Sequence, residues 1–399
     1  MSRLAAIGLM LVLSLPVSAA DWPQFRGPTA NGISTETNLP VKWSAKEGIA
    51  WKTAMPGKGV SSPIVVGETV YVTCSSGPRD DRLHLVALDA AKGTIRWQRT
   101  IAATGSTTCH PTSCMAAPTP VANANAVYAL FATGDLAAFD PQGNPLWYRS
   151  LSGDYPTIIN QVGMASSPIL AGGLLIVPMD NVGDSFIAAV DAKTGVNKWK
   201  IARPKDMNWV SPLVRTVNGK EEIIFQAGKE LAAYDLATGT KTWAFPHESA
   251  SIASPLIEGE KILVPGRPLL AGKLGTSGPQ SAWTSTKLST GNSSPLLYQN
   301  RVYAANSSGV VTCVDAEKGS VLFQERIKGP FSAAPVGADG KVYIVNEAGQ
   351  TTVLKAASEP EILATNDLGE RTMGSPAISN GRLFIRTDKS IVCVASNPK

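Results

Sequence analysis

Histidine, cysteine and acidic side chains are the residues of this sequence that could bind a metal ion or transfer protons. The three histidines, His84, His110 and His247, share no metal-ligand spacing with one another. Asp180 and Asp184 could hold a cation, but two carboxylates four residues apart in a glycine-containing loop are not a calcium-binding motif. The sequence contains no G-x-S-x-G, H-E-x-x-H or Walker motif. We therefore predict no catalytic residues and no metal site.

Two long polar segments supply candidate binding residues instead. They are IAATGSTTCHPTSCMAA after Trp97 and SGDYPTIINQVGMAS after Leu151. Long loops are where binding residues concentrate, although any one polar loop residue is ordinarily a solvated turn. The candidates from these and neighbouring loops are His110, Asp154, Tyr155, Asn160, Gln161, Asp180 and Trp209.

Residues 1–20 are typical of a secretory signal peptide, with one positive charge, an apolar run and small residues at Ser18 and Ala20. No cysteine stands at the expected cleavage point, and no later stretch holds eighteen uninterrupted apolar residues. We expect a periplasmic or secreted protein, without stable membrane insertion after cleavage. An oxidising compartment would allow Cys109 and Cys114 to form a disulfide; two free thiols or a metal pair are the alternatives.

The charge balance excludes one class of partner. The formal net charge is +5, and loss of Arg3 with the signal peptide would leave about +4. There is no cluster of lysine and arginine and no basic helix, so the composition does not indicate nucleic-acid binding.

Two phrases recur along the rest of the chain. The first is a small residue and proline followed by two apolar runs, and its first and last prolines, Pro63 and Pro376, are 313 residues apart over seven intervals. The mean period of about 45 residues is the size of one four-stranded propeller blade. The intervening prolines are Pro118, Pro168, Pro212, Pro255, Pro295 and Pro335.

The second phrase is a strand of small residues, a D-x-x-T-G turn and a tryptophan four residues after the glycine. An indole at this repeated place in each outer strand is expected to pack between adjacent blades. The last copy, SIVCVASNPK, stops before a fourth strand, whereas GIAWKTAMP near the N-terminus supplies one. Pairing the two would close the ring and remove its exposed edge. The expected blade-packing residues are Trp51, Trp97, Trp147, Trp199, Trp243, Trp283 and, in the weaker sixth copy, Phe323.

The A-x-D-x-x-T-G-x-x-x-W phrase, as in residues 188–199 and 232–243, resembles the PQQ-like β-propeller repeat family over residues 21–399. The resemblance implies one of two branches. Quinoprotein dehydrogenases bind pyrroloquinoline quinone (PQQ) and calcium, with a catalytic aspartate and often adjacent cysteines. This sequence has no Cys-Cys pair, and the ligand set matches no motif in it. BamB-like propellers of outer-membrane β-barrel assembly bind partner proteins, but this chain lacks their lipid-acceptor cysteine.

The sequence therefore predicts an all-β, eight-bladed β-propeller of four-stranded antiparallel blades, closed by pairing of the N-terminal strand with the C-terminal blade. Residues 1–20 would be the signal peptide, 21–48 an N-terminal segment and 49–399 the propeller. We expect a non-catalytic binding scaffold for protein partners in the cell envelope, with no resident cofactor. The alternatives are a PQQ- and calcium-dependent oxidoreductase, and a glycan-binding module that uses Tyr155 and Trp209.

Overall fold

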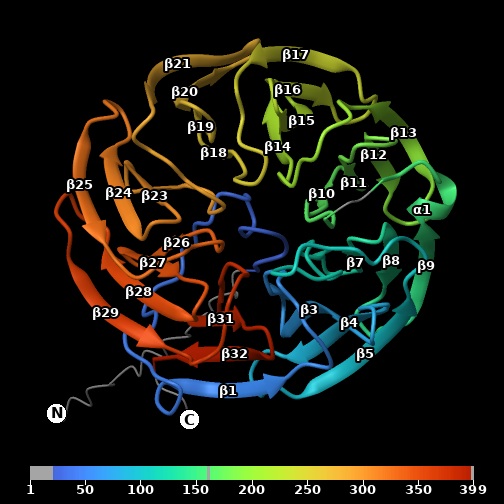
Figure 1. The fold of residues 1–399 in the computed structure, drawn as a ribbon, viewed down its shortest axis with the longest axis horizontal. Helices are drawn as coiled ribbons and strands as arrows, with labels where there is room; N and C mark the ends of the chain where they lie inside the picture. Colours follow the sequence, from blue (N-terminus) through green and yellow to red (C-terminus); the bar gives the residue numbers. More distant parts are fainter. Residues whose placement is uncertain (1–20, 160–161, 397–399) are drawn as a thin grey trace, which may run out of the picture.

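Eight four-stranded antiparallel sheets form a closed ring in the computed structural model, which describes residues 21–159 and 162–396 (Figure 1). This confirms the predicted eight-bladed propeller. The predicted signal peptide lies outside the described residues. Among the residues that are described, no helix is long and apolar enough to cross a membrane.

In each blade the strands run from the channel outward. Blade 1 comprises β2 (Ile64–Val66), β3 (Thr69–Ser76), β4 (Arg82–Asp89) and β5 (Ile95–Ala102). Blade 2 comprises β6 (Val121–Ala122), β7 (Val127–Leu130), β8 (Asp135–Phe139) and β9 (Pro145–Ser150), followed by the single-turn helix α1 (Leu151–Asp154). Blade 3 comprises β10 (Ile169–Ala171), β11 (Leu174–Met179), β12 (Phe186–Asp191) and β13 (Asn197–Ala202). Blade 4 comprises β14 (Leu213–Val217), β15 (Lys220–Ala227), β16 (Glu230–Asp235) and β17 (Lys241–Pro246).

The second half of the ring repeats this order. Blade 5 comprises β18 (Leu256–Glu258), β19 (Lys261–Val264), β20 (Leu269–Gly275) and β21 (Gly278–Ser285). Blade 6 comprises β22 (Leu296–Tyr298), β23 (Arg301–Ala305), β24 (Val310–Asp315) and β25 (Val321–Arg326). Blade 7 comprises β26 (Val336–Ala338), β27 (Lys341–Val345), β28 (Gln350–Lys355) and β29 (Ile362–Asp367). Blade 8 comprises β30 (Ala377–Ser379), β31 (Arg382–Arg386), β32 (Ser390–Ala395) and, as its outer strand, β1 (Ile49–Ala54).

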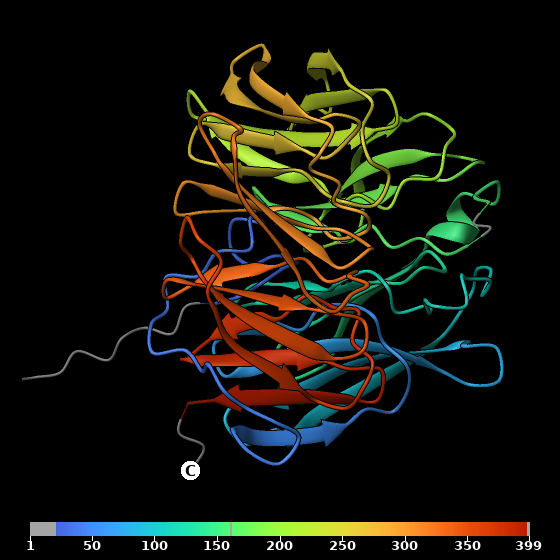
Figure 2. The ribbon, with the colours of Figure 1, turned by 60° about the vertical axis from the view of Figure 1, so that its left-hand side comes forward.

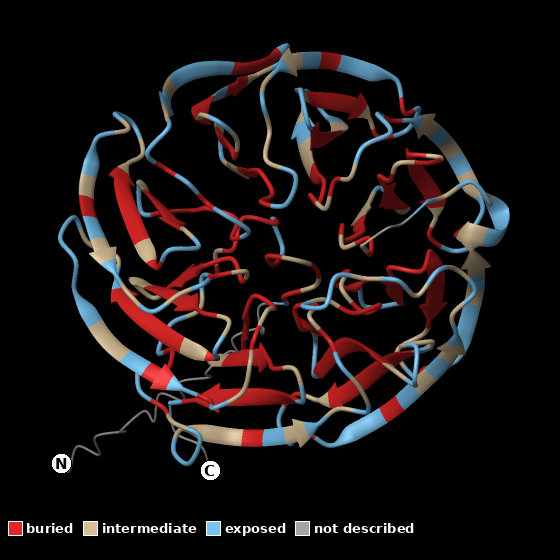
Figure 3. Cartoon of the chain, in the orientation of Figure 1, coloured by how far each residue is buried: buried red, intermediate tan, exposed pale blue. Residues whose placement is uncertain are grey.

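The ring closes where β1 pairs with β32, with Trp51 opposite Cys393. The core lies within and between the blades: their inner strands are buried, while the outermost strands alternate between buried and exposed residues (Figure 3). This alternation is what a half-solvated antiparallel strand requires.

The residue before each blade proline joins neighbouring blades around the channel. The amide of Ser62 donates to Thr119 Oγ1 at 3.0 Å, and the amide of Thr119 donates to Ser167 Oγ at 3.0 Å. The series breaks once, because Ala334 has no hydroxyl to offer the amide of Ser294. The other bonds, at 2.9–3.0 Å, run from Ser167 to Ser211, Ser211 to Ser254, Ser254 to Ser294, Ala334 to Ser375 and Ser375 to Ser62.

The structure also corrects the predicted blade-opening proline of blade 2. Strand β6 follows Pro120, so Pro120 and not Pro118 occupies the blade-opening position in blade 2. The segment AAPTP offers two prolines one residue apart, and only strand pairing distinguishes them.

Each indole that was expected to pack between blades contacts the turn of the next blade. The Trp51 Nε1–H donates to the carbonyl of Ala90 at 3.0 Å, and a Cβ on Gly93 would lie 2.4 Å from the Trp51 ring, so only glycine fits there. The same hydrogen bond from the indole N–H to a backbone carbonyl, at 2.9 Å, joins Trp97 to Pro141, Trp147 to Ala192, Trp199 to Leu236 and Trp283 to Ala316.

Two positions differ from this pattern. Trp243 Nε1 has no acceptor within the described chain, because in blade 5 a short hairpin between Gly275 and Gly278 replaces the D-x-x-T-G turn. Phe323 packs edge-on against Tyr303, with ring centroids 6.5 Å apart.

The N-terminal segment crosses one end of the channel. Trp22 pairs with Val65, and the Arg26 guanidinium donates to the carbonyls of Pro255 at 3.1 Å and Pro295 at 2.6 Å. Burial lowers the pKa of Arg26 to about 9. Figure 2 shows this segment (blue, left) on the face opposite the loop that carries α1 (green, right).

All five cysteines are free thiols in the structure, so the predicted Cys109–Cys114 disulfide is not formed there. Cys114 is fully buried, and burial raises the pKa of its thiol to about 11. Cys109 is half-buried, and burial raises the pKa of its thiol as well. The spacing that suggested a bridge places one thiol in the core and the other beside the loop at Gly163.

Candidate functional site

A cavity of about 350 Å³ opens at the loop-bearing end of the channel. Its rim is built from one residue per blade, the one three positions before the blade proline. Further inward lies a smaller space of about 130 Å³, lined by the ring of hydroxyls and by Phe25 of the N-terminal segment. The eight rim residues are Val60, Ala117, Ala165, Trp209, Ile252, Asn292, Ser332 and Met373.

The two long loops singled out in the sequence meet over this cavity. The amide of His110 donates to the carbonyl of Val162 at 3.0 Å, which joins the loop after β5 to the loop after α1. The Trp209 Nε1–H donates to the carbonyl of Gly163 at 2.6 Å and holds the indole at the rim. The loop of His110 also reaches across blade 1, where Arg371 Nη2 donates to the carbonyl of Thr112 at 3.1 Å.

Only some of the predicted site residues belong to the cavity. His110 and Trp209 line it, and Asn160 and Gln161 lie outside the described residues. Asp154 forms an ion pair with Arg149 at 2.6 Å, on α1 and away from the channel.

Tyr155 lies beside α1 as well. Its ring packs against Phe186 with centroids 4.8 Å apart, and Lys200 Nζ lies 4.2 Å from the ring centroid. Its hydroxyl accepts a hydrogen bond from Asn197 at 2.8 Å. These contacts fix the loop to blade 3.

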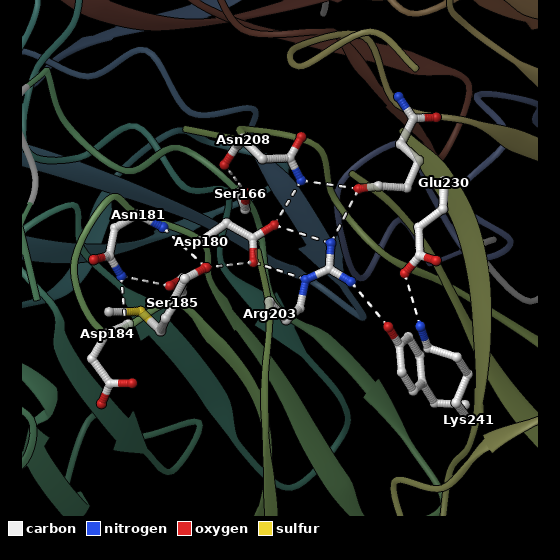
Figure 4. A network of polar contacts seen from close by, with 12 residues as sticks. Ser166, Asp180, Asn181, Asp184, Ser185, Arg203, Asn208, Glu230 and Lys241 are labelled. Atoms are coloured by element: carbon white, nitrogen blue, oxygen red, sulfur yellow. Dashed lines mark hydrogen bonds and ion pairs between the residues drawn. The ribbon is translucent and has the colours of Figure 1, made fainter. Parts of the chain in front are cut away.

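Asp180 forms a buried ion pair, shown with its neighbours in Figure 4. Arg203 Nε donates to Asp180 Oδ1 at 2.8 Å and Arg203 Nη2 to Oδ2 at 3.2 Å, with both side chains at most 2% exposed. Asn208 Nδ2 donates to the same carboxylate at 2.8 Å, and Arg203 Nη1 donates to the hydroxyl of Tyr234 at 3.3 Å.

The Asp180 network links blade 3 to blade 4, because Asp180 follows β11 and Tyr234 lies on β16. Burial alone would lower the pKa of Arg203, but the charge and hydrogen bonds of Asp180 raise it above its ordinary value. Asp180 is therefore paired within the ring and is not available to bind a ligand.

The sequence analysis missed most of the rim, including Ile252, Asn292, Ser332 and Met373. The signal that could have found them is the position three residues before each blade proline. The position directly before the proline is serine or threonine in all blades but one, whereas the rim position carries seven different residue types. The position directly before the proline joins neighbouring blades by hydrogen bonds through its hydroxyl, whereas the rim position can differ from blade to blade.

The cavity offers little to a charged ligand. Of the described residues that line it, His110 alone is ionisable, and the walls are largely apolar at Trp209, Ile252, Met373 and Val60. Within the described residues no group of three or more histidine, cysteine, aspartate or glutamate side chains could hold a metal ion. PQQ is a tricarboxylate that is bound together with calcium, and these lining residues do not fit that pair.

A family model described as outer membrane protein assembly factor BamB matches residues 32–164, 157–292 and 273–359. The chain belongs to this family. The BamB protein of Burkholderia pseudomallei is 29% identical over 344 residues, which are 84% of this chain and 74% of that protein. Alignments with three curated BamB relatives span between 47% and 74% of those proteins' own lengths.

Solved structures share the fold. The crystal structure of BamB from Moraxella catarrhalis superposes with a TM-score of 0.65 at 15% identity, over 87% of this chain and 97% of that one. The quinohemoprotein alcohol dehydrogenase of Comamonas testosteroni superposes with a TM-score of 0.72 at 14% identity, over 95% and 81%. Because a BamB protein and a quinoprotein dehydrogenase both share this fold, the fold alone does not choose between their activities.

Proposed function

We propose that this BamB-family chain is an exported, non-catalytic scaffold that binds a protein partner in the cell envelope through the loop-bearing face of the propeller. The observation that carries the proposal is the apolar cavity at the channel mouth, whose rim differs from blade to blade while the surrounding repeat does not. Family membership supports a role in outer-membrane assembly, which is what the names of the relatives state. Export rests on the signal-peptide pattern of residues 1–20.

Two further apolar side chains support a partner on this face. Ile252 at the rim is 40% exposed, and Ile159 in the loop after α1 is 50% exposed. Large apolar residues exposed beside a cavity are typical of protein-interaction surfaces.

Deletion of the gene in the source organism tests the proposal. We expect a reduced amount of outer-membrane proteins, restored by the wild-type gene. In cells, a photo-crosslinking amino acid at position 159 or 252 should capture an envelope protein, whereas the same amino acid at Val196, in the turn before the outer strand β13, should not. An unchanged outer membrane together with no captured protein would refute the proposal.

The competing PQQ-dependent oxidoreductase is tested on the purified protein. We expect no thermal stabilisation by PQQ with Ca²⁺, and no dye reduction with alcohols or sugars. Tight binding with turnover would replace the scaffold proposal by the enzyme. A glycan-binding module would appear as quenching of tryptophan fluorescence by sugars.

A further inference from the structure

A groove leads outward from the channel mouth across blade 5. Its walls are the segments 248–252 and 286–291, with Gly266 and Arg267 between them, and its volume is about 670 Å³. Ile252 lines both this groove and the mouth cavity, so the two form one continuous surface. We call the groove the blade-5 groove and the cavity at the channel end the mouth.

The walls of the blade-5 groove hold backbone groups without partners. The segments 248–252 and 286–291 lie outside the strands. Within the described chain, the amides of Ser251, Ile252 and Gly291 donate no hydrogen bond. An extended polypeptide presents carbonyl oxygens along its length, and pairing with unused main-chain groups is how such segments are commonly bound.

The groove also carries two charged side chains that have no polar partner among the described residues. Glu248 and Arg267 are exposed and, as far as the described residues go, neither side chain takes part in an ion pair or hydrogen bond. One acid and one base on the walls favour a polar, zwitterionic segment over a ligand of a single charge sign.

The mouth has the opposite character. A cavity of about 150 Å³ suffices to hold benzene, so the mouth, at about 350 Å³, has room for a large apolar side chain. Trp209, Ile252 and Met373 supply apolar walls, and the smaller space beyond them, about 130 Å³ and lined in part by Phe25, limits how deep a side chain can enter. A side chain fits here while the chain that carries it lies in the groove.

We propose that the blade-5 groove and the mouth bind an extended segment of a partner protein, whose main chain lies between 248–252 and 286–291 and whose one large apolar side chain enters the mouth. This rests on the proposed function and names the chemistry of the partner. Ile252 lies at the junction and contacts both parts of the segment.

The test is selection of short random peptides, displayed on phage, against the purified exported protein. We expect the selected peptides to share one large apolar residue with polar neighbours. A selected peptide is then synthesised with a fluorophore, and its affinity is measured by fluorescence anisotropy. Ile252→Asp should weaken binding by at least about tenfold, because a charge replaces a central apolar contact. Met373→Asp, on another wall of the mouth, should also weaken it.

Val321→Asp is the matched control, because Val321 is about as exposed, at 46%, but lies on the outer strand β25, outside both the groove and the cavity. It should leave affinity within about twofold. Equal melting temperatures of the variants show that each has folded. Selected peptides without an apolar residue, equal loss in the control, full affinity in Ile252→Asp, or no selected peptide would each overturn the inference.

The inference and the proposed function fail separately. If an envelope protein is captured in cells through position 159 but not through position 252, the scaffold function stands and the groove proposal falls. If neither position captures a protein and the outer membrane is unchanged, both fall. Capture through 252, mapped by mass spectrometry to a segment with a large apolar residue and lost on adding the selected peptide, supports both.

Discussion

Replacing Asp180 with asparagine should destabilise the protein strongly, because the change removes a charge and hardly alters shape. It leaves the guanidinium of Arg203, at most 2% exposed, without an opposite charge. Two unit charges about 4 Å apart attract by roughly 4 kcal/mol at an effective dielectric constant of 20. Breaking a buried pair by removing one partner costs about 3–5 kcal/mol. We expect the free energy of unfolding to fall by about 3 kcal/mol, the lower end of this range, since the new amide oxygen still accepts a hydrogen bond.

The assay is urea unfolding followed by tryptophan fluorescence, with the transition midpoint and slope compared between variants. The matched control is Glu230→Gln, which breaks the ion pair of Glu230 and Lys241. The N–O distance in that pair, 2.9 Å, is close to the 2.8 Å of the buried pair, but its side chains are 31% and 46% exposed. An exposed pair contributes about 0–1 kcal/mol, so the control should change little.

A double variant separates charge from packing. Asp180→Asn combined with Arg203→Met removes both charges, and it should be more stable than Asp180→Asn alone. If the single variant loses less than about 1 kcal/mol, or if the double variant is no better than the single one, the pair does not act as a desolvated link between blades 3 and 4.

Three smaller predictions concern the ring and one histidine. Ala334→Ser should supply the missing acceptor for the Ser294 amide and raise the free energy of unfolding by about 1 kcal/mol; an unchanged urea midpoint would contradict this. Trp199→Phe should cost about 1 kcal/mol more than Trp243→Phe, because only Trp199 loses an indole hydrogen bond; equal losses would contradict it. Burial, with a smaller contribution from a nearby arginine, lowers the pKa of His84 from 6.5, so the unfolded chain binds more protons and stability should fall as pH decreases below 6.5. In His84→Gln, unfolding measured between pH 7.5 and 5 should show a shallower slope, whereas an identical slope would exclude His84 as its source.

The fold could be predicted from the sequence because the same pattern of residues recurs from blade to blade. The prolines and tryptophans recur at blade spacing, and the truncated last copy together with Trp51 gives the closure between β1 and β32. Blade 5 could not be predicted in detail, since its short hairpin between Gly275 and Gly278 removes the turn that the pattern depends on.

The candidate site was predictable only in part. His110 and Trp209 stand out because a long loop and a large aromatic residue are visible in any sequence. Ile252 and Met373 are single apolar residues in loops, and only the closed ring brings them to the same rim. The burial of Asp180 depends on its pairing with Arg203, which directly follows β13. The loop sequence around Asp180 does not show this pairing, so it suggested an accessible carboxylate.

The closure of the ring has a consequence for the order of folding. Strand β1 is the first strand of the described residues, but β32, its partner, is the last. Until both are in place the eighth blade cannot form, and the partly folded protein is an arc with a free edge at each end, the kind of surface that aggregates. A helper that shields these edges would be needed only until β1 and β32 have paired.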